Sequence, residues 1–241
     1  MLTRLTPRLV PKVWGSTRLE PWFQNAGEKI GEVWFEGVEQ PPLLIKFLFT
    51  TEPLSVQVHP EGKTEMWHIL AAEPGAKIAA GFREPISEQR LRESALSGEI
   101  EQLLEWHEAR PGDTFFIPAG TVHAIGAGLT LCEIQQWSDV TYRLFDYGRP
   151  RELHLDEGAR VSRMGPHAAR QPAHEGTLVT CRHFTTKKLR VDGNASCDAR
   201  MIVLPDGNLK INGQTAKPGE VWHANENGIA LQGQGTVLLT D

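Results

Sequence analysis

The hydrophobic positions of this chain fall in short runs that turns separate. Five such runs are LLIKFLFT (43–50), LSVQVH (54–59), EMWHILAA (65–72), TFFIPA (114–119) and LTLCEIQQW (129–137). The 23 glycines and 16 prolines of the chain punctuate these runs and supply turn signals between them. Short strands in series with turns between them are typical of antiparallel sandwiches and barrels. The pattern therefore predicts an all-β protein.

One segment departs from the strand pattern. In EPISEQRLRESALSGEIEQLLEWHEARPGD (84–113), Leu96, Ile100, Leu103 and Leu104 recur at helical spacing. Ser87 is a suitable N-cap residue ahead of this pattern, and a glycine at position 98 interrupts it. We therefore expect one or two short helices within about residues 85–106, inserted between strands.

A second, smaller β-module is predicted after a polar, proline-containing stretch at 163–177. The tail segment KPGEVWHANENGIALQGQGTVLL echoes RPGDTFFIPAGTVHAIGAGLTLC, because each has PG plus an acid, an apolar run, a turn and another strand. Such an echo indicates a degenerate internal repeat. We therefore predict modules at about 1–165 and 176–241.

Charge and composition limit the kinds of partner and the cellular location that we expect for this chain. The formal net charge of −5 gives no overall attraction to nucleic acid or to an anionic membrane. The first residues contain no apolar run long enough for a signal peptide or a membrane span, which predicts a cytoplasmic protein. Cys132, Cys181 and Cys197 are widely spaced, so we expect plain thiols without a disulfide framework or a cysteine metal knuckle.

Candidate chemistry begins on the predicted strand 54–59. Gln57 and His59 lie two residues apart, so both side chains face the same side of the sheet. On the next predicted strand, alternation places Glu65 and His68 on opposite faces, so only one of them can join a site with the first pair.

A later segment, PGDTFFIPAGTVHAIG (111–126), brings His123 to the start of a strand after a Gly- and Pro-rich turn. Two imidazoles, a carboxylate and a carboxamide oxygen form a donor set suited to Zn²⁺ with one position left for water or substrate. Because a single strand histidine is more often structural than a ligand, local spacing alone leaves this site open.

Seven segments between about residues 12 and 160 together carry a family resemblance. They are WG at Trp14, GEVW (31–34), PLLIKFL (42–48), LSVQVHP (54–60), KTEMW (63–67), PGDTFFIPAGTVHAIG (111–126) and EIQQWSDVTYRLFDYGRPRELH (133–154). In content and order this set resembles the class I mannose-6-phosphate isomerases, in the short form without the large helical insertion. The resemblance implies a cupin-type β-barrel (jelly roll) with a short helical insert, plus a smaller, degenerate cupin-like β-module.

The resemblance also implies roles for particular residues. It places one Zn²⁺ per chain on four ligands: Gln57, His59, Glu65 and His123. It places active-site positions at Lys63, Glu133 and Arg143, and Asp139 alternates onto the face of Arg143. Without the resemblance these would be ordinary turn, core or surface residues. Trp137 and Tyr142 are expected to pack, and histidines such as His68, His107 and His154 are expected to be structural.

The implied function is a zinc-dependent isomerase that interconverts mannose 6-phosphate and fructose 6-phosphate through an enediol or enediolate. Zinc would act as a Lewis acid, and Arg143 and Lys63 would hold negative charge. The proton-transfer group is left open among Lys63, Glu133, Asp139 and a zinc-bound hydroxide. A small-molecule phosphosugar is the partner that these features predict.

Three alternatives remain at this stage: an isomerase of another phosphosugar, a non-catalytic cupin-like sugar-binding or regulatory protein, and an iron-dependent cupin oxygenase. A pure binding module has no need for catalytic cations beside a metal set, and Gln57 is an odd ligand for an oxygenase. In the tail, His223 lies near the position of the first module's proline, and no histidine replaces His123. The second module is therefore expected to bind no metal.

Overall fold

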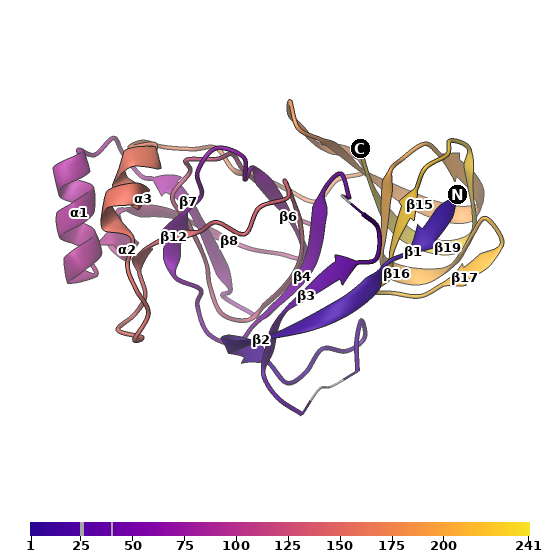
Figure 1. Ribbon diagram of the computed structural model, residues 1–241, viewed down its shortest axis with the longest axis horizontal. Coiled ribbons are helices and arrows are strands. Elements are labelled where there is room, and N and C mark those ends of the chain that lie inside the picture. The colour runs from indigo at the N-terminus through magenta and orange to yellow at the C-terminus, as the bar shows by residue number, and fades with distance from the viewer. Residues whose placement is uncertain (25–26, 40) are drawn as a thin grey trace.

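The computed structural model describes residues 1–24, 27–39 and 41–241, and in it strands form three antiparallel sheets. Figure 1 shows the three helices gathered at one end of the molecule and the sheet built mainly from the C-terminal strands at the other. The all-β prediction is confirmed. No helix among these residues combines the length and the apolar character that crossing a membrane demands.

Two of the sheets belong to the longer, N-terminal part of the chain. The seven-stranded sheet has the order β13-β9-β6-β11-β4-β3-β2, and the five-stranded sheet has the order β12-β5-β10-β7-β8. Their strands are β2 (Thr6–Ser16), β3 (Ile30–Glu36), β4 (Leu44–Thr50), β5 (Val56–Val58), β6 (Glu65–Ala72), β7 (Lys77–Phe82), β8 (Leu104–Glu108), β9 (Thr114–Ile117), β10 (His123–Ile125), β11 (Leu129–Gln135), β12 (Tyr142–Phe145) and β13 (Arg170–Gln171).

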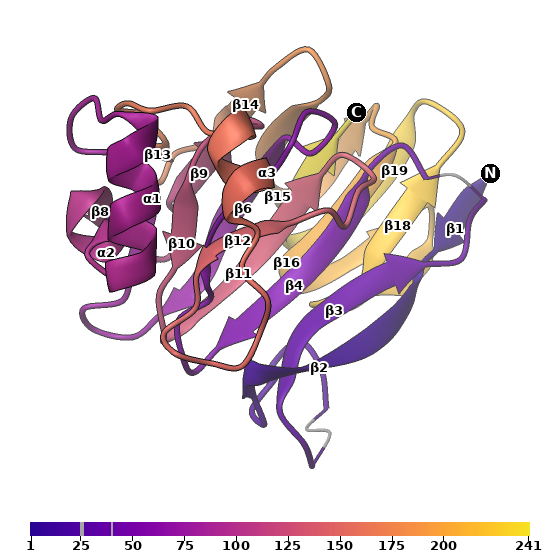
Figure 2. The same cartoon turned by 60° about the vertical axis from the view of Figure 1, so that its left-hand side comes forward.

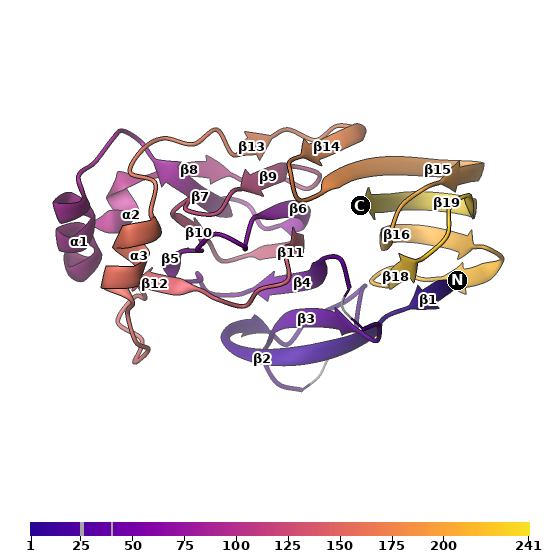
Figure 3. The same ribbon diagram turned by 45° about the horizontal axis from the view of Figure 1, so that its top comes forward.

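The third sheet collects the C-terminal strands and also the first strand of the chain (Figures 2 and 3). Its order is β1-β18-β16-β19-β15-β14, and β17 pairs with β16. The strands are β1 (Leu2–Arg4), β14 (Gly176–Thr180), β15 (Thr185–Cys197), β16 (Met201–Ile211), β17 (Gln214–Ala216), β18 (Val221–Ala224) and β19 (Ile229–Thr240). The division at 1–165 and 176–241 stays a prediction, and β1 pairs across it with β18.

The helical insert consists of α1 (Glu88–Ser97) and α2 (Ile100–Leu103), and α3 (Leu155–Val161) packs beside them. Ser87 caps α1, since its hydroxyl accepts a hydrogen bond from the backbone N–H of Arg90. Helix α1 ends at Gly98, whose φ of 82° is readily adopted only by glycine. Two details of the predicted helical spacing were wrong: Leu96 is 70% exposed, and Leu104 begins β8.

The two Pro-Gly turns of the predicted repeat have the same hydrogen bonds. In the first, the Asp113 carboxylate accepts from the backbone N–H of Arg110, and the Asp113 N–H donates back to the Arg110 carbonyl. In the second, Glu220 and Lys217 make the equivalent pair of bonds. The glycines within the turns have φ values of 89° at Gly112 and 87° at Gly219. The two turns therefore share one local structure, while the repeat of whole modules stays a prediction.

The outer face of the sheet that contains β4 and β11 packs against the third sheet, and together they form one hydrophobic core. Phe35, Phe47 and Ile134 contribute from the barrel side, and Val203 and Leu238 from the C-terminal strands. This packing explains why β4 is buried along its whole length. Its inward side chains face the barrel interior, and its outward ones face the second module.

Replacing Phe47 by alanine should therefore destabilise the whole chain. The ring is fully buried and meets Trp22, Phe23 and Phe35 at centroid distances of 5.5 to 6.5 Å. A Phe-to-Ala cavity of this kind costs about 3–5 kcal/mol of unfolding free energy. Urea denaturation measures this loss. The matched control is Leu96→Ala at an exposed position of α1, and its free energy of unfolding should change by no more than about 0.5 kcal/mol. A loss for Phe47→Ala no larger than the control's would contradict this packing.

Candidate active site

The short strand β5 provides the centre of the site. Its register places Gln57 directly opposite His123 of β10 on one side and opposite Arg143 of β12 on the other. Residues that lie opposite each other in an antiparallel pair face the same side of the sheet. Val56 and Val58 point the other way, into a core with the helices, so Gln57 and His59 turn toward the barrel interior. The alternation predicted for this strand is confirmed.

The facing sheet supplies the acidic and further basic groups. Glu65 begins β6, and two residues along the strand Trp67 lies opposite Glu133 of β11. Glu133 in turn lies opposite Lys46 of β4, and Lys46 lies opposite Trp34 of β3. Trp67, Glu133, Lys46 and Trp34 thus form a row of inward side chains across four neighbouring strands, two residues along β6 from Glu65. Met66 and His68 point outward, and His68 contacts Thr114 there.

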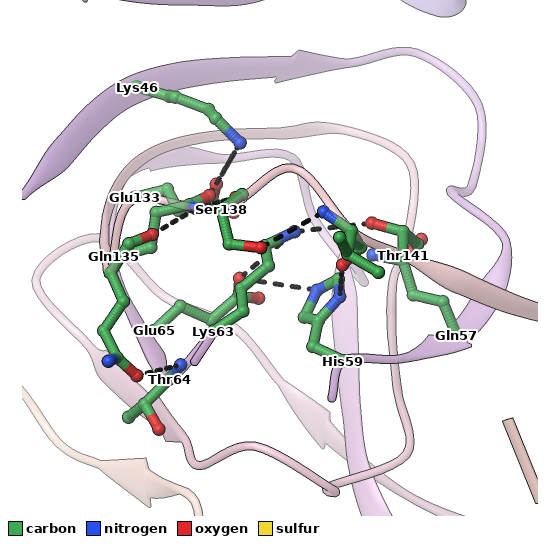
Figure 4. A network of polar contacts seen from close by, with 12 residues as sticks. Lys46, Gln57, His59, Lys63, Thr64, Glu65, Glu133, Gln135, Ser138 and Thr141 are labelled. Carbon is green, nitrogen blue, oxygen red and sulfur yellow. Dashed lines mark hydrogen bonds and ion pairs between the residues drawn. The ribbon is translucent and has the colours of Figure 1, made fainter. Parts of the chain in front are cut away.

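Three predicted ligands converge in the buried interior, and Figure 4 shows two of them, His59 and Glu65, side by side. The ligand atoms of His59, Glu65 and His123 all lie within 4.8 Å of one another. The Glu65 carboxylate is 3.4 Å from His59 Nε2 and 3.8 Å from His123 Nε2. The Gln57 amide nitrogen lies 3.3 Å from His123 Nε2, and its Oε1 accepts from Ser55 Oγ. A half-turn of the planar amide would bring Oε1 toward the cluster and let Nε2 donate to the serine.

The cluster has the donor set of a cation site. The Nδ1 atoms of His59 and His123 face the carbonyls of Val140 at 3.0 Å and Thr121 at 2.8 Å, so each Nδ1 carries the proton and each Nε2 a lone pair. Glu65 Oε2 is buried and has no hydrogen-bond partner within the described part of the chain. Buried acceptors that face one another without a donor are costly, and a metal ion at their centre removes that cost. The residues therefore fit a bound divalent metal.

Burial and neighbouring charges set the protonation of these groups. Burial lowers the pKa of His59 to about 4, although the Glu65 carboxylate opposes the shift. Burial also lowers the pKa of His123 against the same opposition. For Glu65, burial raises the pKa, but the positive charge of Lys63 opposes burial, and the pKa lies below its usual value. At neutral pH the two imidazoles are thus neutral and the carboxylate is charged, as metal binding requires.

The two lysines of the cavity differ in environment. Lys46 donates to Glu133 Oε1 at 2.9 Å and to Gln135 Oε1 at 2.7 Å, and its Nζ lies 4.6 Å from the Trp34 ring centroid. Burial lowers the pKa of Lys46, yet Glu133 and Glu32 raise it above the usual value, so Lys46 is a fixed cation. Within the part of the chain that the structure describes, the Lys63 ammonium has only long contacts, 3.4 Å to Thr141 and 3.9 Å to Glu65, and burial lowers its pKa.

The remaining predicted residues line one cavity of about 450 Å³ together with Gln57, His59 and Lys63. Glu133 is buried and fully paired, since its second oxygen accepts from Trp67 Nε1. Arg143 donates from Nη1 to the Glu152 carbonyl, while its buried Nε has no partner within the described residues. Asp139 lies exposed at the rim.

Several cavity residues were missed from the sequence: Lys12, Glu32, Trp34, Lys46, Arg151 and His154. Three of them had a readable signal. Lys46 is a lone charge inside the apolar run LLIKFLFT, and Glu32 and Trp34 alternate in GEVW. His154, expected to be structural, lines the cavity and accepts from the Arg143 backbone N–H. Trp137, expected to pack, is 50% exposed.

Comparison with known proteins adds an independent line of evidence. No family model matches the chain. The chain is 38% identical over 181 residues to "Mannose-6-phosphate isomerase ManA" of Bacillus subtilis, a match that covers 64% of this chain but only 57% of that relative. It is 30% identical to "Putative mannose-6-phosphate isomerase YvyI" of the same organism, with 79% of this chain and 80% of that protein covered.

The similarity extends to a solved structure. The crystal structure of the mannose 6-phosphate isomerase from Bacillus subtilis matches with a TM-score of 0.85 and 26% identity, over 99% of this chain and 98% of that one. The predicted fold, a cupin-type barrel with a short helical insert and a smaller β-module, is therefore confirmed.

Proposed function

Because this chain belongs to the mannose-6-phosphate isomerase family, we propose that it interconverts mannose 6-phosphate and fructose 6-phosphate by proton transfer through an enediol or enediolate. One Zn²⁺ per chain would be held by Gln57, His59, Glu65 and His123. The observation that carries the proposal is a buried His-Glu-His cluster whose His59 lines the same cavity as Lys63 and Arg143.

The proposed reaction moves one proton between neighbouring carbons of an open-chain sugar. The proton leaves C2 of the aldose and returns to C1 of the ketose, while the hydroxyl and carbonyl exchange places. Bound zinc would supply Lewis acidity toward the sugar oxygens. The protein must also provide a group that takes and returns the proton and cations that stabilise the charge that develops on oxygen.

Lys63 is the proposed proton carrier. Its amine lines the cavity with only long contacts to Thr141 and Glu65 among the described residues, and burial lowers its pKa, as suits a lysine that acts as a base. Glu133 is a poor candidate, since Lys46 and Trp67 already occupy its oxygens, and we assign it to holding Lys46 in place. Asp139, exposed at the rim, would order polar groups at the entrance rather than carry the proton.

Arg143 would stabilise negative charge on the substrate. It lies beside Gln57 in the sheet, and its buried Nε, unpaired among the residues that the structure describes, can donate to a bound oxygen. Lys46 is the second fixed cation in the wall of the same cavity, held by Glu133 and Gln135. Both cations stay charged during the reaction, because neither needs to release a proton.

Assaying the purified protein with mannose 6-phosphate, fructose 6-phosphate and a panel of other phosphosugars tests the proposal. We expect the highest kcat/KM for the mannose–fructose pair, loss of turnover when a chelator removes the metal, and recovery when Zn²⁺ is added. Preference for another phosphosugar would correct the substrate. Full turnover by protein shown to be free of metal would overturn the metal's role, and zinc-loaded protein that binds phosphosugars but isomerises none would be a binding module.

A further inference from the structure

A buried carboxylate beside the cavity holds two arginines at once. Asp146, at the end of β12, is 3% exposed. Arg151 donates to it from Nε and Nη2, each at 2.6 Å, and Arg149 donates to its Oδ1 from Nη2 at 2.7 Å and from Nε at 3.1 Å. Paired guanidinium–carboxylate bonds of this kind fix orientation as well as charge.

The backbone between these residues is a tight turn in an uncommon conformation. Tyr147 and Gly148 both have positive φ, 55° and 75°, and the Arg149 N–H donates to the Asp146 carbonyl at 3.0 Å. Positive φ at both central positions defines a type I′ turn, in which a tyrosine is strained. Phe145, 5.0 Å away, and the Arg149 guanidinium, 5.3 Å away, pack on the Tyr147 ring. Strain of this kind persists where surrounding contacts enforce it and often accompanies a function.

The two arginines differ in what they contact. Arg149 also donates from Nε and Nη2 to two backbone carbonyls, those of Asp146 and Pro53. Arg151 bonds Asp146 through Nε and Nη2, and its side chain, 32% exposed, lines the cavity that contains Arg143. Arg151 also lowers the pKa of Arg143, after burial as the larger cause, so the two guanidinium groups feel each other's charge.

We infer that Asp146 is a positioning residue for the anionic end of the substrate: it fixes Arg151 at the cavity wall so that this guanidinium binds the phosphate group, in the same cavity as Arg143. This inference rests on the proposed function for the identity of the anion. The charged groups around this turn include three arginines, Arg143, Arg149 and Arg151. The carboxylates that act on Arg143 are those of Asp146 and Glu152, so positive charge is in excess among these five groups. The planar, paired N–H donors of a guanidinium match the geometry and charge of a phosphate.

Binding of inorganic phosphate, measured by calorimetry on the zinc-loaded full chain, tests the inference without requiring turnover. Arg151→Gln and Asp146→Asn should each weaken phosphate binding by about tenfold or more, as loss of a charged hydrogen-bond partner does. The double variant should bind no more weakly than Arg151→Gln alone, because Asp146 acts through Arg151. Arg149→Gln is the matched control, since it removes the other guanidinium of the pair and leaves the Asp146–Arg151 contacts. Its affinity should stay within about threefold of the parent.

Several results would overturn the inference. One is undiminished phosphate binding by Arg151→Gln, which does not depend on how Asp146→Asn folds. A second is additive loss in the double variant. A third is a loss in Arg149→Gln as large as in Asp146→Asn, which would assign Asp146 to the fold of the turn. Failure of the proposed function looks different: phosphate affinity would respond as expected while no phosphosugar is isomerised.

Discussion

Replacing His123 by alanine should leave a folded chain that no longer retains zinc. His123 is fully buried, and its Nε2 lies among the other acceptors of the cluster, so no water-exposed residue can substitute for it. Loss of a residue that merely orients a ligand weakens metal binding by about 10–100-fold, and loss of a ligand should exceed this. His59→Ala should behave in the same way. Elemental analysis after dialysis measures the zinc content.

The control is His174→Ala, which removes an exposed histidine far along the chain from the cluster. It should keep the full zinc content. Undiminished zinc in both folded cluster variants would show that these ligands are wrong. Because protonated ligands cannot bind metal, acid should also release the ion. The pKa of the free His59 is about 4, so protons compete poorly for it above that pH. Release on acidification should therefore come well below the ordinary histidine value of about 6.5.

Much of the barrel could be predicted because the features concerned depend on residues that are close together in the sequence. Strand alternation is set by the backbone, so the placement of Gln57 and His59 on one face and of Val56 and Val58 on the other follows from sequence spacing alone. The Ser87 cap and the Gly98 stop of the first helix are likewise decided within a few residues. Alternation also separated Glu65 from His68, but only the family resemblance favoured Glu65.

What could not be predicted depends on pairing between distant segments. Lys46 is a buried residue of the apolar run LLIKFLFT, and its partner Glu133 lies 87 positions further on. Nothing local identifies such a pair. Arg151 lines the cavity because a strained turn and Asp146 direct it there, and neither feature is visible as periodicity. Strand β1 pairs with β18 near the other end of the chain. The predicted module boundary rests on a local stretch of sequence, and such a stretch does not indicate pairing between distant strands.

Arg143→Ala should lower turnover by roughly 10²-fold or more while the fold and the zinc content stay intact, because it removes a donor aimed at charge that develops during the reaction. The buried Nε of Arg143 is unpaired within the described residues, so the free protein loses only the Nη1 bond to the Glu152 carbonyl. Because Arg143 makes few hydrogen bonds in the free protein, its removal should raise the free energy of the transition state more than it lowers the free energy of unfolding. Steady-state kinetics on zinc-loaded protein measure the effect.

Lysine at the same position separates charge from geometry. Arg143→Lys keeps the positive charge but cannot reproduce the paired, planar donors of a guanidinium, so it should recover only part of the lost turnover. The matched control is Arg160→Ala on the exposed face of α3, which should leave turnover unchanged. With folding and zinc content verified for each variant, an unchanged kcat in Arg143→Ala would remove this residue from the mechanism. Full recovery by lysine would instead show that charge alone, without the directed pair of N–H donors, stabilises the reacting oxygens.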